Sequence, residues 1–229
     1  MAPLITLAAL ASTAFAAVLD TRQSGLGRRT DTYDDLATLP GAPQLSAVGT
    51  YNSLLYNGWV VARPGIPFLD ALCFGNTFCL GTLGSGLRPQ SGRQVAATGI
   101  VETLTQIGEI TMKPFGTIAA GNDIGSFNLN SFYFGCIANT GQSLVIPAIG
   151  CTITVTGFYT TGLQAPAQRY TFTPTTRPQA PLALATLPLS YSASLVGLEN
   201  VTIGIAEADL TPGLAVLDID NLVHVNRLI

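Results

Sequence analysis

The segments FNLNSFYFGC (residues 127–136) and CTITVTGFY (residues 151–159) decide the fold class of this chain. Both are rich in the β-branched and aromatic residues that favour strands. In the second segment Cys151, Ile153 and Val155 alternate with threonines, which predicts a strand with one buried face and one solvated face. A disulfide between Cys136 and Cys151 would tie two neighbouring strands of a β-protein together.

Further strand-like runs follow the same pattern between turns rich in glycine, proline and asparagine, and almost no segment has the period of an amphipathic helix. We expect them at residues 45–51, 58–62, 94–102, 108–113, 169–173, 182–187, 201–207 and 214–225. Short strands at this spacing predict an all-β fold, a two-sheet antiparallel β-sandwich (jelly roll) with two local disulfides.

The first residues, MAPLITLAALASTAFA, have the pattern of a secretory signal peptide. We assign residues 1–17 to this signal peptide, residues 18–30 to a flexible leader and residues 31–229 to one β-sandwich domain. The protein is therefore expected to be secreted and extracellular, with no membrane anchor. The leader holds a dibasic pair, Arg28 and Arg29, which a processing protease could cut; an uncut, solvated arm is the alternative.

The four cysteines allow three disulfide pairings, and we favour the local ones, Cys73 with Cys79 and Cys136 with Cys151. On the loop-closure model the second bond removes about 3 kcal/mol of unfolded-chain entropy. Zinc is disfavoured because the cysteines do not form paired C-x-x-C motifs and the single histidine, His224, is distant in sequence.

Charged residues make up 10% of the chain and the net charge is -3, so the surface must be built from uncharged polar side chains. Lys113 is the single lysine. Such a surface offers no basic footprint for nucleic acid. It suits a neutral partner, such as a glycan or a cell-wall polymer.

Several blocks of this sequence resemble a group of uncharacterised secreted β-sandwich proteins of filamentous fungi. These blocks are NSFYFGCIANTGQSL, GCTITVTGFYTTG, GLENVTIGIAEADL and LDIDNLVHVN, with YDDL and YNSLLYNGW nearer the start. More distantly, an acidic pair near the start and Asp-Asn near the end is similar to galactose-binding-like jelly rolls, including carbohydrate-binding modules. That resemblance implies that the two chain ends meet at a structural calcium ion.

Calcium would need six to eight oxygen ligands, which carboxylates and amides from adjacent terminal strands could supply. The candidate ligands are Asp34, Asp35, Asp218, Asp220 and Asn221. In the alternative interpretation, Asp34 and Asp35 mark a turn and Asp218 and Asp220 face solvent on an edge strand. Both interpretations stay open at this point.

Uninterrupted alternation in the last predicted strand sorts its residues onto two faces. One face would carry Leu217, Ile219, Val223 and Val225, and the other would carry Asp218, Asp220, His224 and Asn226, with Leu222 among them.

Sugar binding needs an aromatic platform with amide or carboxylate groups beside it. The stretch 51–59 offers Tyr51, Tyr56 and Trp59 with Asn52 and Asn57. The alternative places Trp59 in the core, since tryptophan is highly buried on average.

A catalytic triad is disfavoured because no G-x-S-x-G motif occurs, and His224 is expected to be a surface or interface histidine. Glu207 with Asp209 is the best local pair of carboxyl groups for glycoside hydrolysis. The tripeptide Asn200, Val201 and Thr202 is a glycosylation sequon at a strand start.

The sequence leaves three functions in order of preference. The first is a secreted, non-catalytic β-sandwich protein that binds carbohydrate or cell wall. The second is a secreted structural or host-interaction protein without glycan specificity, and the third is a β-sandwich glycoside hydrolase. None of them requires a cofactor, although a structural calcium ion is compatible with the first.

Overall fold

The computed structural model describes residues 27–36, 46–62, 72–74, 78–80, 86–99, 115–138, 147–175, 179–188, 195–210 and 215–228. Every regular element in these residues is a strand. In chain order they are β1 (Arg28–Asp31), β2 (Ser46–Tyr51), β3 (Leu54–Ala62), β4 (Leu72–Phe74), β5 (Phe78–Leu80), β6 (Leu87–Arg88), β7 (Val95–Thr98), β8 (Phe115–Ala120), β9 (Ser126–Ala138), β10 (Ala148–Ile149), β11 (Cys151–Tyr159), β12 (Gln168–Phe172), β13 (Ala180–Pro181), β14 (Ala183–Thr186), β15 (Leu198–Ala208) and β16 (Ala215–Arg227).

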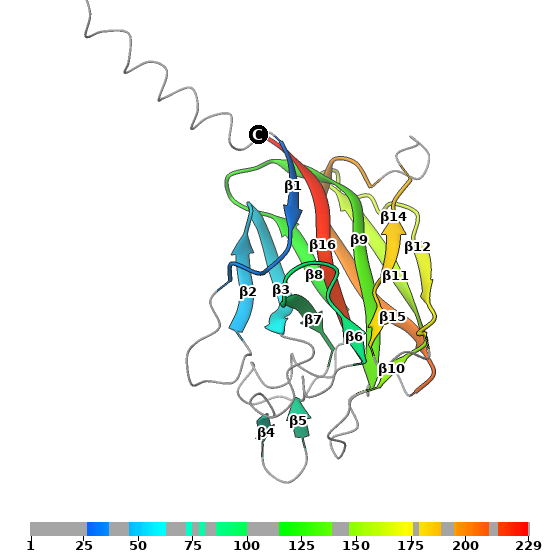
Figure 1. The fold of residues 1–229 in the computed structure, drawn as a ribbon. Coiled ribbons are helices and arrows are strands. Elements are labelled where there is room, and N and C mark those ends of the chain that lie inside the picture. Colours follow the sequence, from blue (N-terminus) through cyan, green and yellow to red (C-terminus); the bar gives the residue numbers. More distant parts are fainter. Residues whose placement is uncertain are drawn as a thin grey trace, which may run out of the picture.

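The main sheet has the strand order β10-β9-β16-β7-β3-β8-β15-β11-β12, and β1, β14 and β2 pair with β16, β9 and β3 (Figure 1). An additional pairing of Leu198 in β15 with Phe127 in β9 closes six of these strands into a barrel-like sheet. Every pairing in the main sheet is antiparallel, whereas the small β13–β6 ribbon is parallel. The predicted all-β, mainly antiparallel class is confirmed, and the two-sheet jelly roll stays a prediction.

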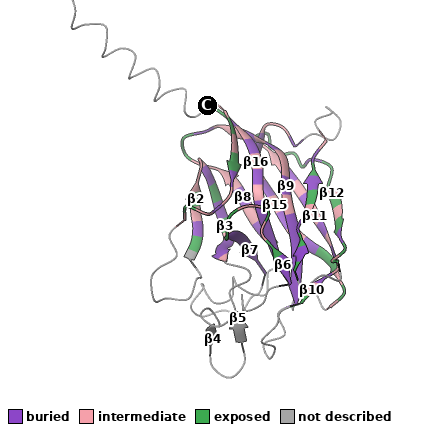
Figure 2. Cartoon of the chain, in the orientation of Figure 1, coloured by how far each residue is buried: buried purple, intermediate pink, exposed green. Residues whose placement is uncertain are grey.

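Buried and half-buried side chains alternate along β11, as the sequence predicts. Cys151, Ile153 and Val155 are at most 4% exposed, whereas the threonines between them are half-buried. On β9, Phe132 and Phe134 are buried and face the interior, and Tyr133 lies on the opposite face. In Figure 2 much of the long strands β9 and β16 is purple, the colour that marks buried residues. The core is therefore a continuous apolar layer enclosed by the sheet.

The predicted faces of the last strand are wrong beyond Asp220. Asn221 has a φ of 47°, and the β16–β9 register shifts between Asp220 and Val223. A β-bulge of this kind inserts a residue and reverses the alternation. His224 and Asn226 therefore face the interior, on the same side as Leu217 and Ile219. The sequence pattern did not show this because Asn221 is the only local hint of a left-handed residue.

The two ends of the described chain meet in one strand pair. Arg28 lies opposite Val225 and Arg29 lies opposite His224. The two strands, β1 and β16, run side by side at the top of Figure 1. The leader predicted for residues 18–30 therefore ends sooner, because residues 28–30 already belong to β1. The signal peptide and residues 18–26 lie outside the described residues, and secretion stays a prediction.

The Cys136–Cys151 disulfide is present, with a Cα–Cα distance of 6.2 Å. It does not join hydrogen-bonded neighbours as expected, since Cys136 is paired with Leu217 and Ile149 while Cys151 is paired with Ala208 and Phe172. The bond therefore ties β9 to β11 across the interior.

The predicted Cys73–Cys79 bond falls on β4 and β5. The backbones of Cys73 and Cys79 lie directly opposite each other in the β4–β5 register. The side chains of these two residues lie outside the described part of the chain. This pairing stays a prediction.

Candidate binding face

The outward side of β12, β11, β15, β8 and β3 forms a polar surface, which we call the threonine face. Antiparallel register places its side chains in rows that run across the strands. Because directly paired residues point to the same side of a sheet, each row is a line of neighbouring side chains. The face comprises Thr152, Thr154, Thr156, Thr171, Thr117, Thr202, Asn57, Gly204 and Phe115.

The central row of this face crosses four strands without an apolar residue. Thr156 pairs with Thr202, Thr202 with Thr117, and Thr117 with Asn57. Adjacent members are about 4.8 Å apart because that is the spacing of paired strands. The row therefore presents a regular line of hydroxyl groups that ends in an amide.

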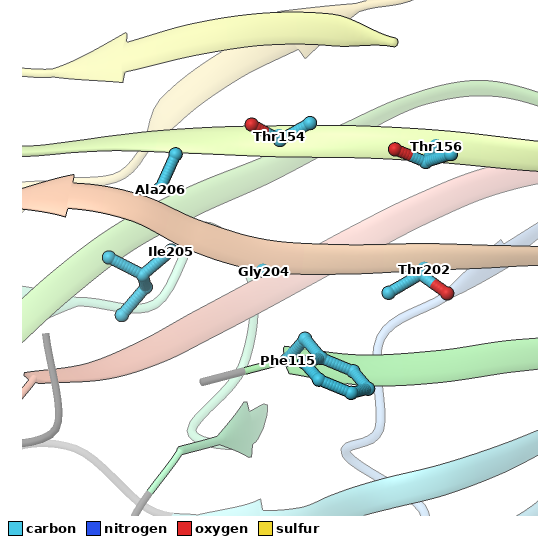
Figure 3. Close-up of a pocket in the computed structure, with 7 residues that line it drawn as sticks. All are labelled: Phe115, Thr154, Thr156, Thr202, Gly204, Ile205 and Ala206. Atoms are coloured by element: carbon cyan, nitrogen blue, oxygen red, sulfur yellow. The ribbon is translucent and has the colours of Figure 1, made fainter. Parts of the chain in front are cut away.

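The next row contains a hollow (Figure 3). Thr154 pairs with Gly204, which pairs with Phe115 at the start of β8. Gly204 has no side chain, so the space between Thr154 and the Phe115 ring is left open, with a volume of about 160 Å³. That is below the roughly 300 Å³ of an ordinary small-molecule pocket. The hollow therefore suits one ring of a larger ligand.

Phe115 is one of the few large apolar side chains exposed on the described surface, at 39%. Its ring borders the hollow beside Thr202 and Gly204. An aromatic ring next to hydroxyl groups can stack on the apolar face of a sugar while the hydroxyls bond to its rim. An exposed aromatic ring beside polar groups, which the sequence predicted in the 51–59 stretch, is thus found at Phe115.

The face carries no net charge. Arg169 and Glu207 form an ion pair at 2.5 Å, and both side chains are more than half exposed. An exposed pair of this kind contributes little to stability, about 0–1 kcal/mol. Its opposite charges nevertheless cancel, so this pair adds no net charge beside the uncharged residues of the threonine face.

The predicted hydrolase pair lies in a second, neighbouring groove, with Thr152, Thr171 and Phe172. Glu207 is bound by Arg169, and the Asp209 carboxylate accepts the Gly150 N–H at 2.9 Å. Both carboxylates thus have structural partners.

The aromatic set of residues 51–59 is largely buried. Trp59 is 1% exposed and Tyr56 is 3% exposed, so neither ring can stack on an external ligand in this structure. This confirms the core interpretation of Trp59 and contradicts the surface role predicted for Tyr56. Asn57 does reach the surface, in the central row of the threonine face.

Tyr51 and Asn52 belong to a different site. The Tyr51 hydroxyl donates to Asp35, and Asn52 Nδ2 donates to Asp31 Oδ1 at 2.7 Å. Burial, followed by the neighbouring Asp35 carboxylate, raises the pKa of Tyr51 well above its ordinary value. Their polar groups therefore serve the fold rather than the threonine face.

Asp31 is the centre of a buried polar cluster where β1, β3 and β16 meet. It accepts hydrogen bonds from Tyr56 and Asn52 and lies 3.3 Å from His224 Nε2. His224 is fully buried, so the prediction of a surface histidine is wrong. Burial is the main cause of the raised pKa of Tyr56, with added contributions from Tyr33 and Asp31.

The cluster continues from His224 to the β2–β3 turn. His224 Nδ1 lies 2.8 Å from Asn226 Oδ1, and Asn226 Nδ2 donates to the Asn52 carbonyl at 3.1 Å. Asn52 has a φ of 48°, a conformation that asparagine tolerates. Because no residue at its centre is exposed, the cluster has a structural role and holds β1, β3 and β16 together.

Two of the predicted calcium ligands hold a loop instead. Asp220 accepts the N–H groups of Gln90 and Ser91, and Asp34 accepts those of Arg93 and Gln94. Burial raises the pKa of Asp220 to about 6, although the backbone donors oppose this. These carboxylates therefore fix the segment between β6 and β7.

A further predicted calcium ligand, Asp218, lies in the interior. Asp218 is 1% exposed, and burial raises its pKa to about 8. The expectation that Asp218 and Asp220 face solvent is wrong, because both are covered. Within the described residues, no group of three or more His, Cys, Asp or Glu side chains is arranged to hold a metal ion. Calcium binding stays a prediction from sequence.

Sequence reasoning missed the threonine face as a site, although it placed the β11 threonines on the solvated side. The signal was the T-x-T-x-T repeat of residues 152–156. Strand pairing, which single-sequence patterns do not give, aligns these residues with Thr117 and Thr202.

In the parts of the chain that the structure describes, we find no helix with the length and apolar character needed to cross a bilayer. No protein-family model matches the sequence, and no curated protein matches it. Among solved structures, the chain is similar to a DUF4465 family protein from Bacteroides caccae. The TM-score is 0.50 at 10% identity, over 88% of this chain and 100% of that one. A likeness at this identity concerns the fold alone, and the fold it supports is an all-β one.

Proposed function

We propose that this protein is a secreted, non-catalytic domain of β-sandwich type that binds an uncharged, hydroxyl-rich polysaccharide through its threonine face. The observation that carries the proposal is the row of Thr154, Gly204 and Phe115, where an exposed ring borders a hollow in a polar face of the sheet. One sugar ring would enter the hollow and stack on Phe115. Neighbouring sugars of the same polymer would lie over the central row.

The electrostatics of the face favour a neutral polymer. The Arg169–Glu207 pair contributes opposite charges, and the rest of the face is threonine, asparagine, glycine and phenylalanine. Hydroxyl groups can both donate and accept, so they match the hydroxyls of a sugar chain in either sense. A polyanion would find no cationic cluster here.

The small volume of the hollow favours a polymer over a small ligand. The hollow of about 160 Å³ suits one ring, so the other sugars of a ligand would lie outside it. A chain that crosses several strands gains contacts from many weak sites, and these add without any deep pocket.

The test is a binding isotherm of the full chain on insoluble β-glucan and chitin particles, with a carboxylated polysaccharide for comparison. We expect saturable binding to at least one neutral polymer that changes less than twofold between 50 mM and 1 M NaCl, since screening acts only on charges. Phe115→Ala should weaken that binding about tenfold, the loss expected for roughly 1.4 kcal/mol of stacking. Gly204→Val, which fills the hollow, should weaken it by a similar factor.

The matched control is Leu184→Ala, because Leu184 is an exposed apolar residue of β14, which pairs with β9 and not with the threonine face. This variant should bind as the unmodified chain does. Absence of binding to every neutral polymer, or equal loss in the control and in Phe115→Ala, would contradict the proposal. Binding to a purified protein partner through Phe115 without any polymer binding would favour a secreted interaction protein instead.

A further inference from the structure

One row of the same sheet differs from the others because its side chains are apolar around a single asparagine. Asn200 in β15 pairs with Phe158 of β11 on one side and with Ala119 of β8 on the other. Ala119 in turn pairs with Leu55 of β3, whose side chain is 38% exposed. Asn200 is thus the polar centre of a short apolar row next to the hydroxyl-rich central row.

Asn200 is also the acceptor residue of the Asn-Val-Thr sequon. Val201 is fully buried and points into the core, so Asn200 and Thr202 both lie on the outward side of β15. Asn200 itself is half-buried rather than enclosed. The sequon is therefore presented on the sheet surface, with an aromatic residue directly opposite its asparagine.

We propose that Asn200 carries an N-linked glycan whose first sugar rests on Phe158 and Ala119. The geometry that points to this is the register of Asn200 with two apolar neighbours. Paired residues of an antiparallel sheet have Cβ atoms about 5 Å apart, so a sugar attached to Asn200 reaches the Phe158 ring. Its apolar C–H face covers the ring, and its hydroxyls stay in solvent.

The modification is a group transfer to the Asn200 side chain. The Asn200 Nδ2 atom loses one proton and forms a bond to the anomeric carbon of an oligosaccharide carried on a polyprenyl diphosphate. The bond from that carbon to the diphosphate oxygen breaks, and the lipid diphosphate leaves. No oxidant or reductant is involved. Transfer to the chain before it folds makes the later position of Asn200 within a strand no obstacle.

The glycan would set one border of the threonine face. It occupies the row of Phe158, Asn200 and Ala119, and the central row with Thr202 begins two residues further along β15. This consequence rests on the proposed function, whereas the glycan itself is tested without any polymer. We expect the unglycosylated chain to bind the polymer at least as tightly as the glycosylated chain.

The first experiment is intact-mass measurement of the full chain secreted by a eukaryotic host. The unmodified sequence and Thr202→Ser, which keeps the sequon, should both carry the mass of one N-glycan. Asn200→Gln and Thr202→Val, which destroy the sequon, should lack it. A secreted chain without glycan in the first two cases would overturn the site.

The second experiment tests the resting place of the sugar by a double-mutant cycle on melting temperature. Phe158→Ala is measured in the glycosylated chain and in the Asn200→Gln background. If the sugar covers Phe158, glycosylation should raise the melting temperature by about 2–4 °C, the scale of one good contact in a domain of this size. Phe158→Ala should remove that rise.

Phe115→Ala is the matched control, because Phe115 lies in a different row of the same sheet. It should leave the glycan-dependent rise unchanged. An equal rise with Phe158 and with alanine at that position would overturn the proposed contact. Such a result would leave the polymer-binding proposal untouched.

Discussion

His224 Nε2 lies 3.3 Å from Asp31 Oδ1, a buried contact between residues 193 positions apart in the sequence. Both side chains are fully buried. Asp31 belongs to β1 and His224 to β16, so this contact joins the first and last strands of the described chain. The polar groups around it, from Tyr56, Asn52 and Asn226, complete the hydrogen bonding that burial demands.

Asp31→Ala should therefore destabilise the protein strongly. It leaves the buried His224 ring, the Tyr56 hydroxyl and the Asn52 amide without their acceptor. Removal of one member of a buried pair costs about 3–5 kcal/mol. Urea unfolding would measure the loss, with Asp123→Ala as control because Asp123 is an exposed acceptor for Ser53. A loss below about 1 kcal/mol in Asp31→Ala would contradict the structural role of the cluster.

The buried Asp218 predicts that the free energy of unfolding falls as the pH rises. Its folded pKa, about 8, lies above the ordinary aspartate value of 3.8, so the folded state holds the proton more tightly. The stabilisation from this group is complete below about pH 4 and is lost as the pH rises through 8, with a slope of at most about 1.4 kcal/mol per pH unit. Asp218→Asn, which stays neutral, should flatten the stability profile from pH 4 to 8.

Asp220 gives a comparison for that experiment. Its pKa is raised in the same direction, to about 6, so its contribution is lost over a narrower range, from about pH 4 to 6. Melting temperatures measured every half pH unit for Asp218→Asn and Asp220→Asn would separate the contributions of the two carboxyl groups. An Asp218→Asn profile parallel to that of the unmodified chain between pH 6 and 8 would show that Asp218 is ionised in the fold.

Gly92→Ala should destabilise the segment between β6 and β7. Gly92 has a φ of 47°, and a Cβ atom there would lie 2.0 Å from Asp34 Oδ2. The Asp34 carboxylate cannot retreat freely, because it accepts the N–H groups of Arg93 and Gln94. We expect a loss of about 2–3 kcal/mol from backbone strain plus a displaced carboxylate, measured by urea unfolding.

Gly162→Ala is the matched control for Gly92. Gly162 also has a positive φ, 78°, but nothing lies within 4 Å of an added Cβ. This variant should show the backbone cost alone, about 1 kcal/mol. Equal losses in the two variants would mean that contact with Asp34 contributes nothing.

Replacement of Cys136 and Cys151 by alanine should lower the free energy of unfolding by about 3 kcal/mol. The bond closes a loop with a sequence separation of 15 residues, which corresponds to that figure on the chain-entropy model. Denaturant unfolding of the double variant measures the loss, and variants are preferable to a reducing agent because they act on Cys136 and Cys151 alone. The Tyr170→Phe variant is a control, since it removes one hydrogen bond, to the Thr186 carbonyl, between β12 and β14, the strands that pair with β11 and β9. A double variant as stable as this control would contradict the estimate.

Local sequence patterns predicted most long strands because alternation is written in consecutive residues. The strand predicted for residues 152–159 matches β11, and those for residues 127–135 and 214–225 match β9 and β16. β1 and β8 were missed, since both are short and only Phe115 and Ile118 in β8 are large apolar residues. The strand predicted for residues 108–113 lies outside the described residues.

The candidate sites were harder to predict because each depends on residues from distant strands. The sequence predicted that the aromatic residues at 51–59 form a surface platform. In the structure, Gly58 has a φ of 76° and Trp59 packs against Gly116, so the Trp59 ring lies inside. Similarly, the acidic residues near both ends do come together in space. Backbone N–H groups of residues 90–94 donate to the carboxylates of Asp34 and Asp220. The spacing of these residues in the sequence could not reveal this.

By itself, the sequence determined the all-β class, the buried and solvated faces of β11 and the use of Cys136 with Cys151. These depend on side-chain period and on short separations, which the chain encodes locally. Only the tertiary structure decided that His224 is buried against Asp31 and that Phe115, Gly204 and Thr154 share a row. The physical reason is that a bulge such as that at Asn221 reverses every later side chain, and strand register joins residues far apart in sequence.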